Sequence, residues 1–214
     1  MMNLLRRYLP EPIVLIGLAF AFVFFGLTFR GPRSRFWQRM TWTGLTLGSL
    51  SLVAEPKLRR AHFGPREAAV GLGSAGILYV IFQIGDRLAR LILPHGGAEI
   101  GAIYGLEKLR PRQELAARLA FIIGPAEELF WRGLVQARLM KQFGLLPGYV
   151  LGTAAYGGAH LVTGNFTLIG AATVAGAFWG GLAALGAPLE ALIISHSFWD
   201  VFIFLIAPTV NKRD

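Results

Sequence analysis

Long uncharged stretches follow one another along the chain, and polar or basic positions separate them. Residues 12–29 and 68–85 carry no charged side chain, and no Asp, Glu, Lys or Arg lies between Lys141 and Glu190. Apolar stretches of about 18 or more residues without alternation indicate membrane-spanning helices. We predict helices over the following ranges: 10–29, 66–84, 113–141, 146–162, 166–186 and 189–207.

Two segments fit this pattern less well. Residues 40–54 are uncharged but short and rich in Thr, Ser and Gly, so we expect a tilted, re-entrant or interfacial segment. Residues 86–113 are mixed and contain breakers such as Pro94 and Pro111, which predicts a short amphipathic helix and a loop at the membrane surface.

The predicted fold class is all-α, a polytopic membrane bundle of about 6–8 hydrophobic helices, because only helices and closed barrels span a bilayer. We expect one continuous membrane domain with two parts. Membrane helices and basic surface loops occupy residues 1–112, and a helical core that carries the chemistry occupies residues 113–208.

Composition and charge support a membrane location. Hydrophobic residues make up 54% of the chain and charged residues 15%, whereas soluble domains carry about 25% charged residues. The net charge of +9 comes largely from basic clusters that flank apolar segments, which is typical of membrane-flanking cations and not of a nucleic-acid-binding face. We expect an integral, multi-pass protein of the bacterial inner membrane, with membrane lipids and no nucleic acid among its partners.

Six charged or titratable residues interrupt the apolar helices, and a charge at membrane depth costs about 2.5–3.5 kcal/mol on insertion scales. They are Glu127, Glu128, Arg132, His160, His196 and Asp200. Residues four apart share a helix face, so three pairs can meet. These pairs are Glu128 with Arg132, Tyr156 with His160, and His196 with Asp200.

Each of these groups has a structural alternative. Glu128 and Arg132 are compatible with a buried ion pair, His160 with a core histidine, and His196 and Asp200 with a locked helix-to-helix hydrogen bond. Glu127 has no cation three or four residues further on. Together the six residues indicate a functional centre.

The residue types limit the chemistry. The chain has no cysteine, which excludes thiol catalysis and Cys-bound zinc. Ser195 directly precedes His196, and adjacent side chains do not face each other on a helix. Glu127 and His160 can together activate water, and His196 can donate a hydrogen bond to the developing oxyanion. This set predicts peptide or amide hydrolysis without a covalent intermediate.

These residues resemble a known family. The CPBP intramembrane proteases include the type II CAAX prenyl proteases and the bacteriocin-processing, Abi-like enzymes. Their motifs EExxxR, [FY]xxxH and HxxxN or HxxxD are similar to the segments that run from Glu127 to Arg132, from Tyr156 to His160 and from His196 to Asp200.

The resemblance implies an intramembrane endopeptidase that needs no cofactor. Its substrate would be a membrane-associated protein or peptide, for example one with a C-terminal sorting or lipidated tail. By position, Glu127 and His160 would activate water, and His196 and Asp200 would support the oxyanion. Glu128, Arg132 and Tyr156 complete the motifs, and the first two would hold the site together.

One position departs from the commoner pattern. Members that process CAAX sequences usually have Asn where this chain has Asp200, and an ionised carboxylate cannot donate to an oxyanion. Asp200 would then be protonated, or it would orient and charge His196, or it would help to bind a metal with Glu127, His160 and His196. A zinc-dependent protease that uses Glu127, His160 and His196 as ligands stays an alternative. A non-enzymatic transporter or scaffold with a Glu–His proton relay is the second alternative.

Overall fold

A computed structural model describes residues 9–209. Within this range the chain is mainly helical and contains no strand, so the predicted all-α fold class is confirmed. The α-helices, in chain order, are α2 (Pro12–Phe29), α3 (Phe36–Ala54), α4 (Pro65–Ile92), α5 (Gly96–Tyr104), α6 (Arg112–Arg118), α7 (Gly124–Glu128), α8 (Ala137–Phe143), α9 (Leu145–Ala159), α10 (Phe166–Ala184) and α11 (Leu189–Val201).

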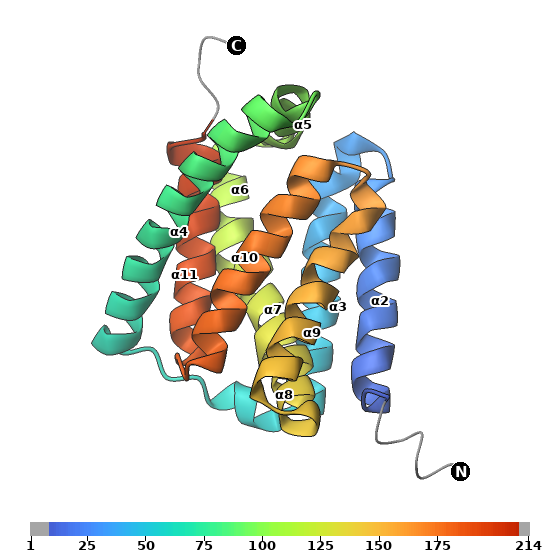
Figure 1. The fold of residues 1–214 in the computed structure, drawn as a ribbon, viewed down its shortest axis with the longest axis vertical. Helices are drawn as coiled ribbons and strands as arrows, with labels where there is room; N and C mark the ends of the chain where they lie inside the picture. Colours follow the sequence, from blue (N-terminus) through green and yellow to red (C-terminus); the bar gives the residue numbers. More distant parts are fainter. Residues whose placement is uncertain (1–8, 210–214) are drawn as a thin grey trace.

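The long helices pack side by side, and chain neighbours run in opposite directions (Figure 1). The helices α2 and α3 form one side of the bundle, and α4 with α11 forms the other. The helices α9 and α10 lie in front in this view, and α5 lies across one end. The short helix α7 contacts both α3 and α11, so it occupies the interior, where its side chains face several helices.

Residues 112–143 form one continuous helical stretch that contains α6, α7 and α8. Two π-helical segments, Leu119–Ile123 and Leu129–Gln136, lie on either side of α7. Pro125 has no N–H and cannot continue a regular α-helical hydrogen-bond ladder, so the widened backbone before it accommodates the ring. The helix predicted over 113–141 is thus present, but α7 has its own geometry, and π segments of this kind are frequent at functional sites.

Residues 40–54, predicted to be tilted, re-entrant or interfacial, lie in one helix, and this helix is not among the described segments that are apolar enough to cross a membrane. The helix α3 has 19 residues, which corresponds to about 28 Å. Several of its small and hydroxyl residues are buried, namely Thr43, Gly44, Gly48 and Ser51. Gly44 and Gly48 lie against Ala126 of α7, where a Cβ would come within 3.4 and 3.1 Å of the Ala126 Cβ. The two glycines thus allow α3 to pack closely against α7.

Glycine allows two other close helix approaches near the interior. A Cβ on Gly71 of α4 would lie 2.7 Å from Ile194 of α11. A Cβ on Gly176 of α10 would lie 2.9 Å from the ring of Tyr156 on α9. These glycines bring α4 against α11 and α10 against α9, as expected for small residues in membrane helix contacts.

Four of the described helical segments are long and apolar enough to cross a membrane: Pro12–Phe29, Pro65–Ile92, Phe166–Ala184 and Leu189–Ile206. The last of these joins α11 to a π-helical end. The span predicted over 66–84 continues to Ile92, which places the following surface segment later than expected. The protein is an integral membrane protein.

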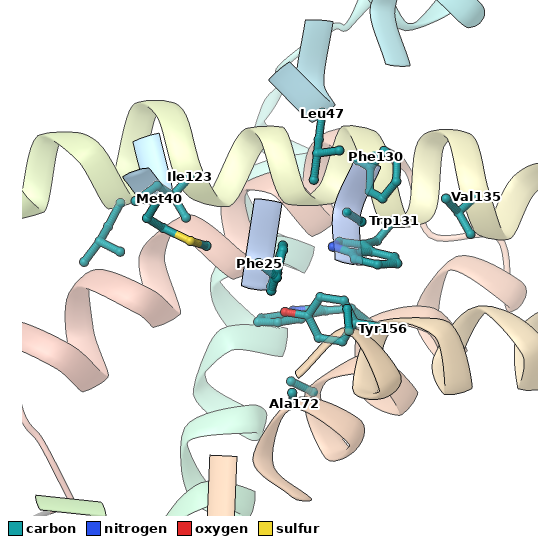
Figure 2. Close-up of a cluster of buried hydrophobic side chains, with 14 of the residues drawn as sticks. Phe25, Met40, Leu47, Ile123, Phe130, Trp131, Val135, Tyr156 and Ala172 are labelled. Carbon is teal, nitrogen blue, oxygen red and sulfur yellow. The ribbon is translucent and has the colours of Figure 1, made fainter. Parts of the chain in front are cut away.

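A cluster of buried aromatic and aliphatic side chains fills the centre of the bundle (Figure 2). Trp131 packs edge-on against Tyr156, with ring centroids 5.2 Å apart, and Phe25 packs edge-on against Trp131 at 6.3 Å. Phe25 also contacts the ring of His160 at 5.1 Å. The hydrophobic core thus extends directly to the polar residues that the sequence singled out.

Candidate active site

The four predicted catalytic residues line one cavity of about 710 Å³. Glu127 comes from α7, His160 from the turn after α9, and His196 and Asp200 from α11. Three separate parts of the chain therefore converge here. Glu128 and Arg132 lie behind the cavity wall and are buried.

Glu127 is buried, and one of its carboxylate oxygens is held by a neighbouring helix. The Tyr156 hydroxyl donates a 2.9 Å hydrogen bond to Glu127 Oε2. Tyr156 lies on α9 and is itself on the cavity wall. Since Glu127 is held by a neutral donor and has no ion pair among residues 9–209, it lies in the cavity as a possible proton acceptor.

His160 follows the last residue of α9 and begins a short 3₁₀ turn. Its Nδ1 lies 2.9 Å from the backbone carbonyl oxygen of Tyr156. A carbonyl oxygen only accepts, so Nδ1 carries the proton and a neutral ring keeps the lone pair on Nε2. Edge contacts from Phe25 and Tyr156 hold the ring in place. This tautomer suits a ring that accepts a hydrogen bond from water.

Glu128, Arg132 and His196 form a buried hydrogen-bonded triad. Arg132 Nη1 donates to Glu128 Oε1 at 2.9 Å, and His196 Nδ1 lies 2.7 Å from the same oxygen. The Glu128 side chain is fully buried. The guanidinium of Arg132 also lies over the ring of Tyr156, 4.6 Å from its centroid. The pair expected from the i, i+4 spacing is present, and it also reaches a histidine on another helix.

Asp200 lies differently from our expectation. The distance from Asp200 Oδ2 to His196 Nε2 is 3.7 Å, which is too long for a hydrogen bond. The acceptor that orients the ring is Glu128, from α7, and not Asp200. Helical spacing reveals only partners within one helix, so the sequence could not indicate this bond between helices. Asp200 instead places its carboxylate beside the second ring nitrogen, on the cavity side.

This arrangement defines what His196 can do. Because Nδ1 is hydrogen-bonded to Glu128, only Nε2 can face a substrate. Nε2 can donate a hydrogen bond only when the ring carries both protons. Carboxylates then lie near both nitrogens, with Glu128 at one and Asp200 at the other.

The zinc alternative has no preformed site. Within residues 9–209, no three His, Asp or Glu side chains are grouped closely enough to hold one metal ion. Glu127, His160 and His196 share the cavity, but they do not form a ligand set as placed. The zinc alternative stays a prediction that only experiment can test.

Trp179 is a site residue that the sequence did not single out. It is fully buried on α10 and lies on the cavity wall, and its indole stacks on the His196 ring at 3.9 Å between centroids and 21° between planes. A tryptophan in an apolar helix carries no signal of its own, because such residues fill cores and interfaces throughout membrane proteins.

Residues 114–202 match a family described as type II CAAX prenyl endopeptidase Rce1-like. This part of the chain is similar to that family. The Rce1-like segment contains all three motifs, so the resemblance to CPBP intramembrane proteases is confirmed. No curated protein and no solved structure matches the chain. The match over residues 114–202, together with the membrane helices, supports an intramembrane endopeptidase.

Proposed function

We propose that the protein hydrolyses a peptide bond of a membrane-associated protein or peptide, using water activated by Glu127 and His160. The convergence of Glu127, His160, His196 and Asp200 on one cavity carries this proposal. No nucleophilic cysteine exists in the chain. Ser195 is fully buried, and Trp179 donates a hydrogen bond to its hydroxyl oxygen.

Water is held between two acceptors and attacks the substrate carbonyl. One water O–H points to Nε2 of His160, which carries the lone pair, and the other points to the carboxylate of Glu127. As the oxygen forms its bond to the carbonyl carbon, Glu127 takes the proton. The carbonyl π electrons move to the oxygen and give a tetrahedral oxyanion.

His196 stabilises that oxyanion. Its Nε2–H donates to the negative oxygen while Glu128 holds Nδ1, and Asp200 stabilises the positive ring. The protonated Glu127 then passes its proton to the amine nitrogen as the C–N bond breaks. The products are a new carboxyl terminus and a free amine, so one water is consumed and no covalent enzyme intermediate forms.

The cavity walls indicate the kind of substrate. Besides the polar residues, the lining is mainly apolar and aromatic, with contributions from Phe36, Trp37 and Met40 of α3 and from Ile81 and Phe82 of α4. Such walls favour an apolar group beside the scissile bond. We therefore propose a substrate with an apolar or lipidated C-terminal tail.

The test is cleavage by purified protein in proteoliposomes. Peptides that end in a prenylated Cys-aliphatic-aliphatic-X sequence are compared with the same peptides without the lipid, and mass spectrometry identifies the cleaved bond. Cleavage of the lipidated peptide supports the proposal in full. Cleavage of the unlipidated peptide alone would support the peptidase activity and would contradict the proposal that the substrate tail is lipidated.

The two alternatives give different results in the same assay. A zinc enzyme loses activity after treatment with a strong chelator and regains it with zinc, whereas the proposed mechanism predicts activity that survives. A transporter or scaffold cleaves none of the peptides even when it is well folded.

A further inference from the structure

The indole of Trp179 stacks on the imidazole ring of His196. Its ring lies 3.9 Å from the imidazole, centroid to centroid, and nearly parallel to it. By contrast, Trp199 meets Trp179 edge-on, at 85°. Two contacts thus fix the orientation of the histidine ring. Glu128 fixes its rotation in the plane through Nδ1, and Trp179 fixes the plane itself.

Two serines hold the indole in this orientation. Trp179 Nε1–H donates to Ser195 Oγ at 3.0 Å, and the Ser74 hydroxyl donates to the same oxygen at 2.9 Å. Both serines are buried. Ser74 lies on α4, Ser195 on α11 and Trp179 on α10, so this hydrogen-bonded group joins three helices at the cavity.

This network explains a serine that the reaction does not use. Ser195 is adjacent to His196 in the chain, but its side chain points to Trp179 and not to the histidine ring. Through the indole, Ser195 therefore acts on the ring of His196, its neighbour in the chain. Buried Trp N–H groups usually have an acceptor, and here Ser195 Oγ, as that acceptor, holds the indole against the imidazole.

The geometry points to Trp179 as a positioning residue for His196, held in place by Ser195 and Ser74. This inference rests on the proposed function. The stack keeps Nε2 directed to the oxyanion position, and the face of an indole attracts a cation, so it also favours the doubly protonated ring that the oxyanion requires. Small errors in the position of a reacting group reduce rates strongly.

The experiment compares Trp179→Phe and Trp179→Leu with wild type in the proteoliposome cleavage assay. Phe keeps an aromatic face and loses the N–H, whereas Leu removes both. We expect kcat to decrease in the order wild type, Phe, Leu, by roughly 10- to 100-fold for Leu, with KM unchanged. Thermal unfolding in detergent measures the folded fraction of each variant.

A double-mutant cycle separates positioning from packing. In a His196→Gln background, which is expected to keep a low residual rate, replacement of Trp179 should have little further effect on kcat. Equal losses in both backgrounds would show that Trp179 only packs the core. A higher KM at unchanged kcat would show that Trp179 contacts substrate instead. Either result overturns the inference.

Ser195→Ala provides a second variant if the Trp179 variants do not fold. It leaves the indole without its acceptor and should reduce kcat at unchanged KM; wild-type kcat in a folded Ser195→Ala protein would contradict the inference. Failure of the proposed function is distinguishable, because a folded wild-type protein would then cleave no peptide. Activity that is insensitive to Trp179 and Ser195 removes the positioning role alone.

Discussion

Replacement of Arg132 by Met should destabilise the protein strongly, because it leaves the Glu128 carboxylate buried without its principal cation. Arg132 Nη1 lies 2.9 Å from Glu128 Oε1, and the two side chains are 2% and 0% exposed. Breaking a buried ion pair by removing one partner costs about 3–5 kcal/mol. Met keeps much of the apolar volume, so the loss reports the charge.

Arg118→Met is the matched control. Arg118 and Glu114 also form an i, i+4 pair on the same helical stretch, with a nitrogen–oxygen distance of 2.8 Å, but their side chains are 26% and 36% exposed. Partly exposed pairs contribute about 0–1 kcal/mol. Thermal unfolding in detergent should therefore show a much larger decrease in the midpoint for Arg132→Met than for Arg118→Met.

The double variant Glu128→Gln, Arg132→Met makes this reasoning refutable. Gln removes the uncompensated charge and retains a polar group near His196, so the double variant should recover part of the stability that Arg132→Met loses. Strictly additive losses would show that the two residues do not stabilise each other. An Arg132→Met effect no larger than that of Arg118→Met would refute the buried pair itself.

Two further predictions concern carboxylates elsewhere in the site and fold. Asp200→Asn should reduce kcat roughly 10-fold or more, because a charge pair at about 4 Å is worth up to about 4 kcal/mol at intermediate dielectric; an equal or higher rate in the Asn variant would show that the position needs a donor. Hydrogen bonds from the Thr167 hydroxyl and from backbone N–H groups lower the pKa of Glu99. The contribution of Glu99 to the free energy of unfolding is therefore complete above the ordinary glutamate pKa, and it is lost as pH falls through the lowered pKa. Glu99 accepts from the backbone N–H of Thr167 in the first turn of α10. Glu99→Gln should therefore reduce the unfolding midpoint at pH 7, by an amount comparable with the loss of a helix-capping side chain, about 0.5–2 kcal/mol. The difference from wild type should shrink in acid, and a difference independent of pH would contradict this contribution of the carboxylate.

The helices were largely predictable, because uncharged runs mark where the chain meets lipid. The exception was α3, whose Gly44 and Gly48 pack against Ala126. Hydropathy measures affinity for lipid, and it does not register a helix whose small residues face another helix. The end of α4 was also missed, since Asp86 and Arg90 form an i, i+4 pair that neutralises the charge within the helix.

The site was predictable in its residues but not in its connections. Glu127, His160 and His196 stand out because charged or titratable groups are costly in apolar helices. The bond between Glu128 and His196 joins α7 to α11, and no spacing along the chain reveals it. The stack of Trp179 on His196 likewise depends on the meeting of two helices.

The central claim is that Glu127 activates the attacking water, and the cleavage rate of Glu127→Gln tests it most directly. Gln keeps the size of the side chain and an oxygen that accepts from Tyr156, and removes only the base. The account predicts a well-folded protein with kcat reduced by at least about 100-fold, while Glu114→Gln, whose carboxylate lies outside the cavity, keeps the wild-type rate. Near-normal turnover by folded Glu127→Gln would contradict the account.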